Sequence, residues 1–229
     1  MKVHGEIRVP GDKSISHRAL MLSALADAGA AFERDDYLQA ARDCAGFLTT
    51  RMRDADGRLL RTYNRGQAKL AAYLEDYAFL VEALLSLYEA TFDPRWFGEA
   101  RRLADTLIER FADAERGGFF STASDHEPLI ARRKELDDAP IPSGSSSAAF
   151  GLLRLSALTG EHAYEEAAVG TLRLLHEVAP RHPSAFGHLL QAIDFQLATV
   201  REVALVGDGI EPLARVVRGA FRPHMVVSG

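Results

Sequence analysis

The chain has 229 residues, of which 47% are hydrophobic and 26% charged, and its formal net charge is −5 at pH 7. This composition is typical of a globular protein with a sizeable core, and the acidic balance argues against a nucleic-acid partner. No apolar run approaches the ~20 residues that span a bilayer, and the start lacks a basic-then-apolar leader, so we expect a cytoplasmic protein without a membrane partner.

The first thirty residues have the pattern of a strand, a turn and a helix. Apolar and polar residues alternate over residues 3–9, as in a half-buried strand, and a Pro-Gly pair ends the alternation. Asp12 or Ser14 is placed to cap the helix that follows, and Gly29 is placed to end it. We therefore expect a short N-terminal strand-helix unit.

The turn of this unit carries a chemical motif. Its sequence PGDKSISHRAL, followed through LMLSALADAG, resembles the N-terminal segment of EPSP synthase (3-phosphoshikimate 1-carboxyvinyltransferase). A lysine and a hydroxyl at a helix N-terminus favour an anion, and a residue four positions later lies on the same helix face. The resemblance implies that Lys13, Ser14 and Arg18 bind shikimate 3-phosphate and phosphoenolpyruvate. The alternative is a solvated turn without a ligand, because the match ends near Gly29 and the family's other substrate-binding and acid/base residues have no counterpart.

After residue 30, apolar residues spaced three and four apart predict a series of helices. One helix is expected over 37–52 and a short strand over 59–63. The strongest helical pattern covers 74–88, and an Asp-Pro pair then begins an antiparallel partner that ends at Phe111. Two long helices joined by a tight turn form an αα-hairpin.

A loop from Gly117 to Gly144 separates this hairpin from a second one, with helices expected over 146–158 and 164–175. The second hairpin repeats the first after one gap, since Thr91, Asp93, Trp96, Glu99 and Ala100 align with Thr159, Glu161, Tyr164, Glu166 and Ala167. Repeated hairpins must stack to bury their apolar stripes, which favours an α-solenoid or a closed α-toroid. A further helix is expected over 184–197.

The tail changes character. VALVG at 203–207, a short helix around 213–217 and MVV at 225–227 indicate a small β-α-β unit.

From about residue 40 to residue 227 the chain resembles the C-terminal part of the thioredoxin-domain-containing YyaL/spermatogenesis-associated-protein-20 family (DUF255). DGRLLRTYNRGQA, LEDYAFLVEALLSLYEATFDPRWFGEA, GGFFST and IPSGSSSAAFGLLRLSALTG carry this resemblance. It implies an (α/α)6 toroid similar to those of N-acylglucosamine 2-epimerases and glycoside hydrolases. We therefore expect a mainly α fold, an incomplete (α/α)6-toroid arc of helical hairpins, with the strand-helix unit at 1–29, the helical body at 30–200 and the β-α-β tail at 201–229.

In α-toroids the ligand pocket lies at one end of the central funnel, lined by loops and by the starts of the inner helices. The resemblance thus implies a lining that comprises Tyr63, Arg65, Glu75, Asp76, Tyr77, Arg132, Arg133, Lys134, Glu135, Ser143, Gly144, Ser145 and Ser146.

Structural roles compete with this implication. Glu75 and Asp76 point about 100° apart on a helix, so an acidic pair that favours the helix dipole is preferred to a glycosidase pair. The serine-rich run at 143–146 predicts a helix cap, because no G-x-S-x-G elbow is present. The charged run ARRKELDD predicts a solvated surface or, in a loop beside a pocket, a means of gathering an anionic sugar or phosphate.

Histidine and cysteine chemistry is weakly indicated. His176, His182 and His188 are spaced six apart, and toroid epimerases use histidines as acid/base pairs beside a carbonyl. Six is not a helical repeat, so solvated or locally bonded histidines are expected. Cys44 predicts a buried thiol, and without a His-x-x-x-His pair or a second cysteine we expect no metal and no cofactor.

Three functions remain open at this point. The chain is a carboxyvinyl transferase of the EPSP synthase type acting on small anionic substrates, a sugar-binding or sugar-isomerising α-toroid, or a non-enzymatic helical fragment. An incomplete arc exposes apolar helix faces, so we also expect homo-oligomers.

Overall fold

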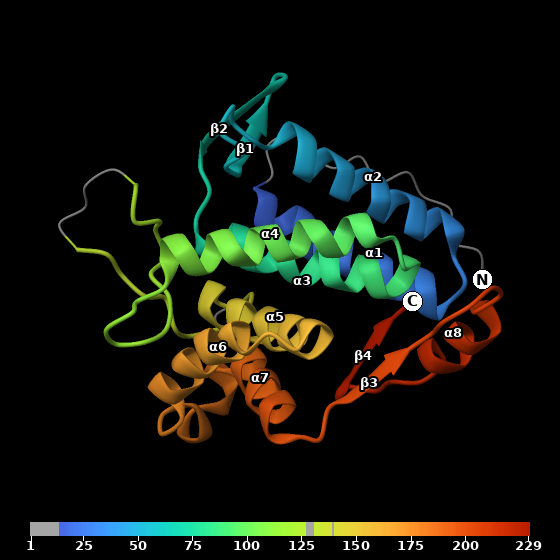
Figure 1. Ribbon diagram of the computed structural model, residues 1–229. Coiled ribbons are helices and arrows are strands. Elements are labelled where there is room, and N and C mark those ends of the chain that lie inside the picture. Colours follow the sequence, from blue (N-terminus) through green and yellow to red (C-terminus); the bar gives the residue numbers. More distant parts are fainter. Residues whose placement is uncertain (1–13, 127–130, 139) are drawn as a thin grey trace.

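The computed structural model describes residues 14–126, 131–138 and 140–229 (Figure 1). Its helices are α1 (Ile15–Ala31), α2 (Asp35–Arg51), α3 (Leu74–Thr91), α4 (Pro94–Phe111), α5 (Gly144–Thr159), α6 (His162–Leu175), α7 (Gly187–Leu197) and α8 (Glu211–Arg218). Its strands are β1 (Leu60–Asn64), β2 (Gln67–Ala71), β3 (Arg201–Ala204) and β4 (Met225–Ser228). The strand predicted over 3–9 and the cap predicted at Asp12 lie outside the described residues.

Seven of these helices form two rows. The first, here called the inner row, consists of α1, α3, α5 and α7, each packed against the next. The outer row consists of α2, α4 and α6, and each of these packs on the inner helix that precedes it in the chain (Figure 1). Stacked hairpins with an inner and an outer row form an arc of an α-toroid. The predicted fold class is therefore the observed one.

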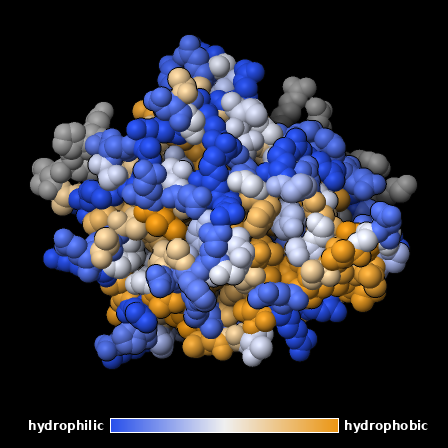
Figure 2. Space-filling model, in the orientation of Figure 1, coloured by the Kyte–Doolittle hydropathy of each residue, from blue (hydrophilic) through white to orange (hydrophobic). Residues whose placement is uncertain are grey.

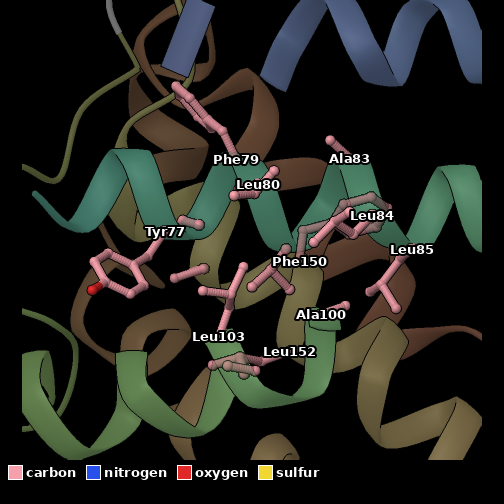
Figure 3. Close-up of a cluster of buried hydrophobic side chains, with 14 of the residues drawn as sticks. Tyr77, Phe79, Leu80, Ala83, Leu84, Leu85, Ala100, Leu103, Phe150 and Leu152 are labelled. Carbon is pink, nitrogen blue, oxygen red and sulfur yellow. The ribbon is translucent and has the colours of Figure 1, made fainter. Parts of the chain in front are cut away.

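The core is centred on α3. α1, α4 and α5 pack around this helix and bury it on almost every side, so its sequence is apolar nearly all round rather than amphipathic. The labelled side chains in Figure 3 come from α3, α4 and α5 and belong to one buried cluster that includes Leu84, Leu103 and Phe150. Full burial of such a side chain contributes ~1.5–3 kcal/mol, so packing rather than local helix propensity holds the rows together.

α1 belongs to the same core as the hairpins. Its buried residues Ile15, Ala19, Leu22 and Ala26 are spaced four, three and four apart and lie in one cluster with those of α3. The predicted stop at Gly29 is wrong, because α1 continues to Ala31. Gly29 instead lets α2 approach, since a Cβ there would lie 2.8 Å from the Leu38 Cγ atom.

The duplicated hairpin is visible in its hydrogen bonds. The Thr91 hydroxyl donates to the Leu87 carbonyl at 2.6 Å, and the Thr159 hydroxyl donates to the Leu155 carbonyl at 2.8 Å. Each threonine also accepts the backbone N–H two residues later. In the first hairpin Asp93 then caps α4 by accepting from the N–H of Arg95, with proline at the first helical position, as predicted.

The region between α2 and α3 differs from the sequence prediction. The strand predicted over 59–63 is β1, but it pairs antiparallel with a second strand, β2, that was not predicted. Arg65 and Gly66 form the turn with φ values of 49° and 82°, which the glycine adopts without strain. β2 was not predicted because its sequence QAKLA is short and largely exposed, and one brief polar-apolar alternation does not distinguish a strand from a loop.

The tail has the predicted β-α-β connection. β3 and β4 pair in parallel, with Arg201 opposite Met225, and α8 makes the crossover between them. β4 packs against α3 and α5, so the tail covers one end of the inner row. None of the helices in the described parts of the chain is long and apolar enough to cross a membrane.

Candidate functional site

A polar stripe runs along the inner row within otherwise apolar helices. On α3 it consists of Glu75, Glu82, Ser86 and Glu89, whose spacings of seven, four and three residues place them on one helix face. Each of these side chains has a polar or charged neighbour on an adjacent element. Buried polar groups are retained only when they are paired, so the stripe is an organised feature of the fold.

Glu82 is the centre of the stripe. Its carboxylate accepts a hydrogen bond from the Ser147 hydroxyl of α5 and lies 3.0 Å from Nε2 of His188 on α7. The Glu82 and His188 side chains are 15% and 17% exposed, so both are largely screened from water yet reachable. Three successive inner helices thus contribute one side chain each to a single cluster.

The His188 ring is held by its surroundings. Asp138, in the loop before α5, accepts the N–H groups of His188 and Leu189 at 2.8 and 3.2 Å and so caps the start of α7. The His188 ring and the Phe150 ring are in a T-shaped arrangement, with centroids 5.4 Å apart. Burial acts to lower the pKa of His188, but the charge of Glu82 and its hydrogen bond outweigh burial and raise the pKa. The pair therefore favours a charged imidazolium.

Further along α3 the stripe contains a buried arginine. Nη2 of Arg154 on α5 lies 3.3 Å from the Glu89 carboxylate, and its Nη1 donates to the Ser86 hydroxyl at 3.5 Å. Ser23 of α1 donates to the same hydroxyl at 3.2 Å. Burial raises the pKa of Glu89 and Arg154 opposes that rise, so this second cluster links α1, α3 and α5.

The starts of α3 and α5 line a depression. A depression of about 290 Å³ is lined by Arg61, Tyr73, Leu74, Glu75, Ser121, Glu135 and Gly144. Arg61 lies 2.7 Å from the Glu75 carboxylate and 4.5 Å from the centre of the Tyr73 ring. Of the predicted lining residues, Glu75, Glu135 and Gly144 are thus brought together.

Several other predicted lining residues have structural roles. The fully buried Asp76 accepts the N–H groups of Tyr73 and Ser16, and burial raises its pKa against these hydrogen bonds. The Tyr77 hydroxyl accepts the N–H of Leu59 at 3.2 Å. Ser143 caps α5 through the N–H of Ser146 at 3.1 Å, as predicted for this run. The Ser145 hydroxyl donates to the Glu135 carbonyl.

The remaining predicted lining residues lie elsewhere. Tyr63 packs edge-on against Phe47, and Arg65 lines a separate depression at the tip of the β1-β2 hairpin. Arg132 donates to the carbonyls of Thr122 and Arg110, and Lys134 donates to Gly117 and pairs with Asp113. These two cations therefore hold the long loop in place. The solvated surface predicted for ARRKELDD is found in part, because exposure alternates from 131 to 138.

The N-terminal motif is partly described. Lys13 lies outside the described residues. Ser14 occupies the cap position of α1, but its hydroxyl bonds to the Ser16 hydroxyl and to the His17 ring instead of capping the helix. The Arg18 guanidinium lies 5.5 Å from the centre of the Phe47 ring, and burial lowers its pKa.

Sequence reasoning missed the central cluster. His176 bonds locally to the Arg173 carbonyl and His182 is exposed, as expected, but His188 pairs with a carboxylate 106 positions away. The sequence feature that could have indicated this cluster is Glu82. It is a carboxylate in the middle of the strongly apolar helix α3, and it is spaced seven residues from both Glu75 and Glu89. No local spacing links this carboxylate to His188 or to Asp138.

Comparison with known proteins supports both resemblances. The family model for EPSP synthase (3-phosphoshikimate 1-carboxyvinyltransferase) matches residues 1–49. A 3-phosphoshikimate 1-carboxyvinyltransferase from Halorhodospira halophila is 84% identical over 25 residues, which are 11% of this chain and 6% of that protein. Spermatogenesis-associated protein 20 from Homo sapiens is 34% identical over 222 residues. That match covers 91% of this chain, and the chain spans 28% of the length of the human protein.

Solved structures give the fold. A cellobiose 2-epimerase from Spirochaeta thermophila and the GH76 α-mannanase BT2949 from Bacteroides thetaiotaomicron each align with a TM-score of 0.58 over 72% of this chain, at 22% and 18% identity. The alignments cover 43% and 44% of those proteins, in agreement with an incomplete arc. The chain is therefore an α-toroid arc similar to spermatogenesis-associated protein 20 over most of its length and to 3-phosphoshikimate 1-carboxyvinyltransferase at its start.

Proposed function

We propose that this chain is the sugar-binding part of an α-toroid and that Glu82 and His188 form its proton-transfer pair. The observation that carries the proposal is the 3.0 Å contact between these two side chains on α3 and α7, with the Ser147 hydroxyl on the same carboxylate. Sugar epimerases and glycoside hydrolases of the same fold support the choice of a sugar.

The pair suits acid/base chemistry beside a carbonyl. An imidazolium held by a carboxylate donates a proton to a sugar oxygen, or in its neutral form accepts one from the adjacent carbon. Asp138 acts as a positioning residue, because it fixes the backbone from which His188 projects. Isomerisation or epimerisation of a sugar moves one such proton, so this is the reaction class we propose.

Binding of free sugars tests the proposal. Isothermal titration with glucose, mannose, N-acetylglucosamine and cellobiose is expected to give saturable binding of at least one sugar, and His188→Gln is expected to weaken it at least tenfold. His182→Gln is the matched control, because His182 is exposed. Exchange of the sugar C2 proton in deuterated water, followed by NMR, reports the chemistry. Equal affinity of the parent chain and His188→Gln for every sugar would contradict the proposal.

Carboxyvinyl transfer is the second candidate, and the match over residues 1–49 favours it. The geometry gives it less support, since the Asp76 carboxylate already accepts the N–H of Ser16 at 3.3 Å at the start of α1. An anion at that helix end would meet a negative neighbour.

Calorimetry with shikimate 3-phosphate, alone and with phosphoenolpyruvate, decides this second candidate. If it holds, the parent chain binds shikimate 3-phosphate and Lys13→Ala loses at least tenfold in affinity, while Lys69→Ala, on the β1-β2 hairpin, does not. Absence of binding by the parent chain removes the candidate.

A further inference from the structure

β3 forms an open edge of the tail sheet. This sheet has two strands, and β4 is the strand that packs against α3 and α5. The N–H groups of Arg201 and Leu205 donate to carbonyls at or next to the ends of β4, at 2.9 and 2.8 Å. Successive residues of a strand point their backbone groups to opposite sides, so Glu202 and Ala204 direct theirs away from β4.

This edge is available to a further strand. Within the described parts of the chain no third strand pairs with β3, and Glu202 and Ala204 are both exposed. Each of these residues offers one backbone donor and one backbone acceptor. An unpaired strand edge is a template for β-augmentation, in which an extended segment adds as the next strand.

A depression beside this edge carries negative charge. Its volume is about 290 Å³, and it lies between the start of β3, the C-terminal ends of α5 and α7 and the start of α6. Glu165 and Glu202 are in its lining, whereas the lining contains no lysine or arginine. Gln196 donates to the Glu165 carboxylate at 2.9 Å and His162 lies 3.6 Å from it, while Glu202 has no ion-pair partner within the described residues. The depression therefore favours a cation.

Both carboxylates can be reached from solvent. The Glu165 side chain is 40% exposed, and Glu202 is exposed on β3. The lining also includes the buried side chains of Leu153 and Phe195, which suit the methylene stem of a lysine or arginine. The volume is just below the ~300–1,000 Å³ of small-molecule sites, so the depression suits one side chain rather than a separate ligand.

An added strand would direct side chains toward this depression. The Glu202 side chain is part of the lining, and side chains that lie opposite each other on neighbouring strands project from the same face of a sheet. The residue of an added strand that lies opposite Glu202 is therefore directed toward the depression. A lysine or arginine at that position would meet Glu202 and Glu165.

The neighbours of that cationic residue would meet an apolar surface. Val206 follows β3 and is 88% exposed, and Leu213 on α8 is 58% exposed. Figure 2 shows hydrophobic side chains gathered over the tail, at the lower right of the molecule. Apolar β-branched residues on both sides of the cation suit this surface and favour the extended backbone that the edge requires.

A second copy of this chain fits the edge less well. Edge-to-edge pairing of two copies would bring their Glu165 and Glu202 carboxylates close together, and like charges across a strand pair are destabilising. Charge complementarity therefore selects a basic partner.

We propose that the outer edge of β3 is a β-augmentation site for an extended segment of another protein, in which a lysine or arginine lies between apolar residues. The cationic side chain enters the depression beside Glu202, and the backbone of the segment pairs with Glu202 and Ala204. This goes beyond the proposed function, because the edge uses neither Glu82 nor His188.

Fluorescence anisotropy with the full chain and the rhodamine-labelled peptide Thr-Val-Lys-Val-Thr-amide tests the charge of the partner. Saturable binding is expected, and replacing the peptide lysine with glutamate is expected to weaken it at least tenfold. Glu202→Gln is expected to weaken it about threefold, since an exposed ion pair contributes little. Glu166→Gln is the matched control, because Glu166 is exposed, adjacent to Glu165 and outside the lining.

Backbone pairing is tested separately. Ala204→Pro removes an outward N–H at an edge position where proline is tolerated, and it is expected to weaken binding at least tenfold, whereas Ala204→Ser is expected to leave binding unchanged. Circular dichroism shows whether both variants are folded. In the peptide, N-methylation of the two valines is compared with N-methylation of the lysine and the last threonine. One pattern is expected to abolish binding and the other to spare it, because only one side of an added strand faces β3.

Each outcome bears on the edge alone. Absence of peptide binding by the parent chain overturns the proposal, as does equal affinity for the lysine and glutamate peptides. Equal loss from both methylation patterns would show that the contact is not strand pairing. Dimerisation of the parent chain that Ala204→Pro removes would show that a second copy occupies the edge, which also overturns the proposal.

Discussion

At the scale of single residues, Asp138 of the long loop connects the starts of two helices. One oxygen accepts the N–H of Ser143 at 2.8 Å, and the other accepts the first N–H groups of α7. A carboxylate that satisfies three backbone donors at two helix starts both stabilises the fold and fixes His188.

Asp138→Ala is therefore expected to lower the free energy of unfolding by about 2–3 kcal/mol, because it leaves these backbone donors without their charged partner. Urea denaturation followed by circular dichroism measures this change. Asp137→Ala is the matched control, since Asp137 is adjacent and exposed. A loss no larger than that of the control would show that Asp138 does not cap these helices.

His188 gives stability a defined dependence on pH. Its pKa is raised in the folded chain, chiefly because Glu82 outweighs burial. The interaction that raises this pKa stabilises the fold fully at pH values below the unfolded-state pKa of about 6.5. This stabilisation is lost as the pH rises through the folded-state pKa. The difference in unfolding free energy between the parent chain and His188→Gln is thus expected to be largest below pH 6.5 and to shrink above it. Denaturation series from pH 5.5 to 8.5 measure it, and a difference that grows with pH contradicts the assignment.

At the scale of elements, two helix glycines predict opposite effects of the same substitution. A Cβ on Gly29 would lie 2.8 Å from the Leu38 Cγ atom and 3.0 Å from the Leu38 backbone nitrogen, whereas a Cβ on Gly46 would meet nothing within 4 Å. Gly29→Ala is expected to destabilise the fold by about 1–3 kcal/mol through overpacking of α1 on α2. Gly46→Ala is expected to be neutral or to stabilise by up to about 1 kcal/mol through helix propensity.

Thermal unfolding of the two variants measures both effects. Equal melting temperatures would mean that α2 shifts away from α1 at little cost and that the close approach at Gly29 is not required.

Elements were predictable where the signal is local. The three-and-four spacing of Ala100, Leu103 and Leu107 predicted α4, and the alignment of Thr91 with Thr159 predicted the repeated turn. The end of α1 was not predictable from Gly29. A glycine can end a helix or allow a second helix to approach closely, and the sequence alone does not distinguish these two roles.

At the scale of the whole molecule, the toroid arc could be predicted from the repeated hairpins in the sequence. The position of the Glu82–His188 cluster could not be predicted from that fold. The predicted lining assumed that loops and helix starts converge, and the structure divides those residues among separate depressions and structural contacts. The Glu82–His188 contact joins α3 to α7 in a cluster that also includes α5, and tertiary pairing of this kind leaves no periodic pattern in the sequence.

The burial of α3 on almost every side also determines how the molecule opens. A helix enclosed by three others exposes its amides to hydrogen exchange only when the whole array unfolds, whereas α7, with fewer packed neighbours, opens at lower cost. Glu82 therefore lies on the helix that opens only by global unfolding, and His188 lies on a helix that opens locally at lower free energy. A ligand that binds both side chains would slow the exchange of α7 amides, and it would also slow that of α3 amides because it stabilises the folded array against global unfolding.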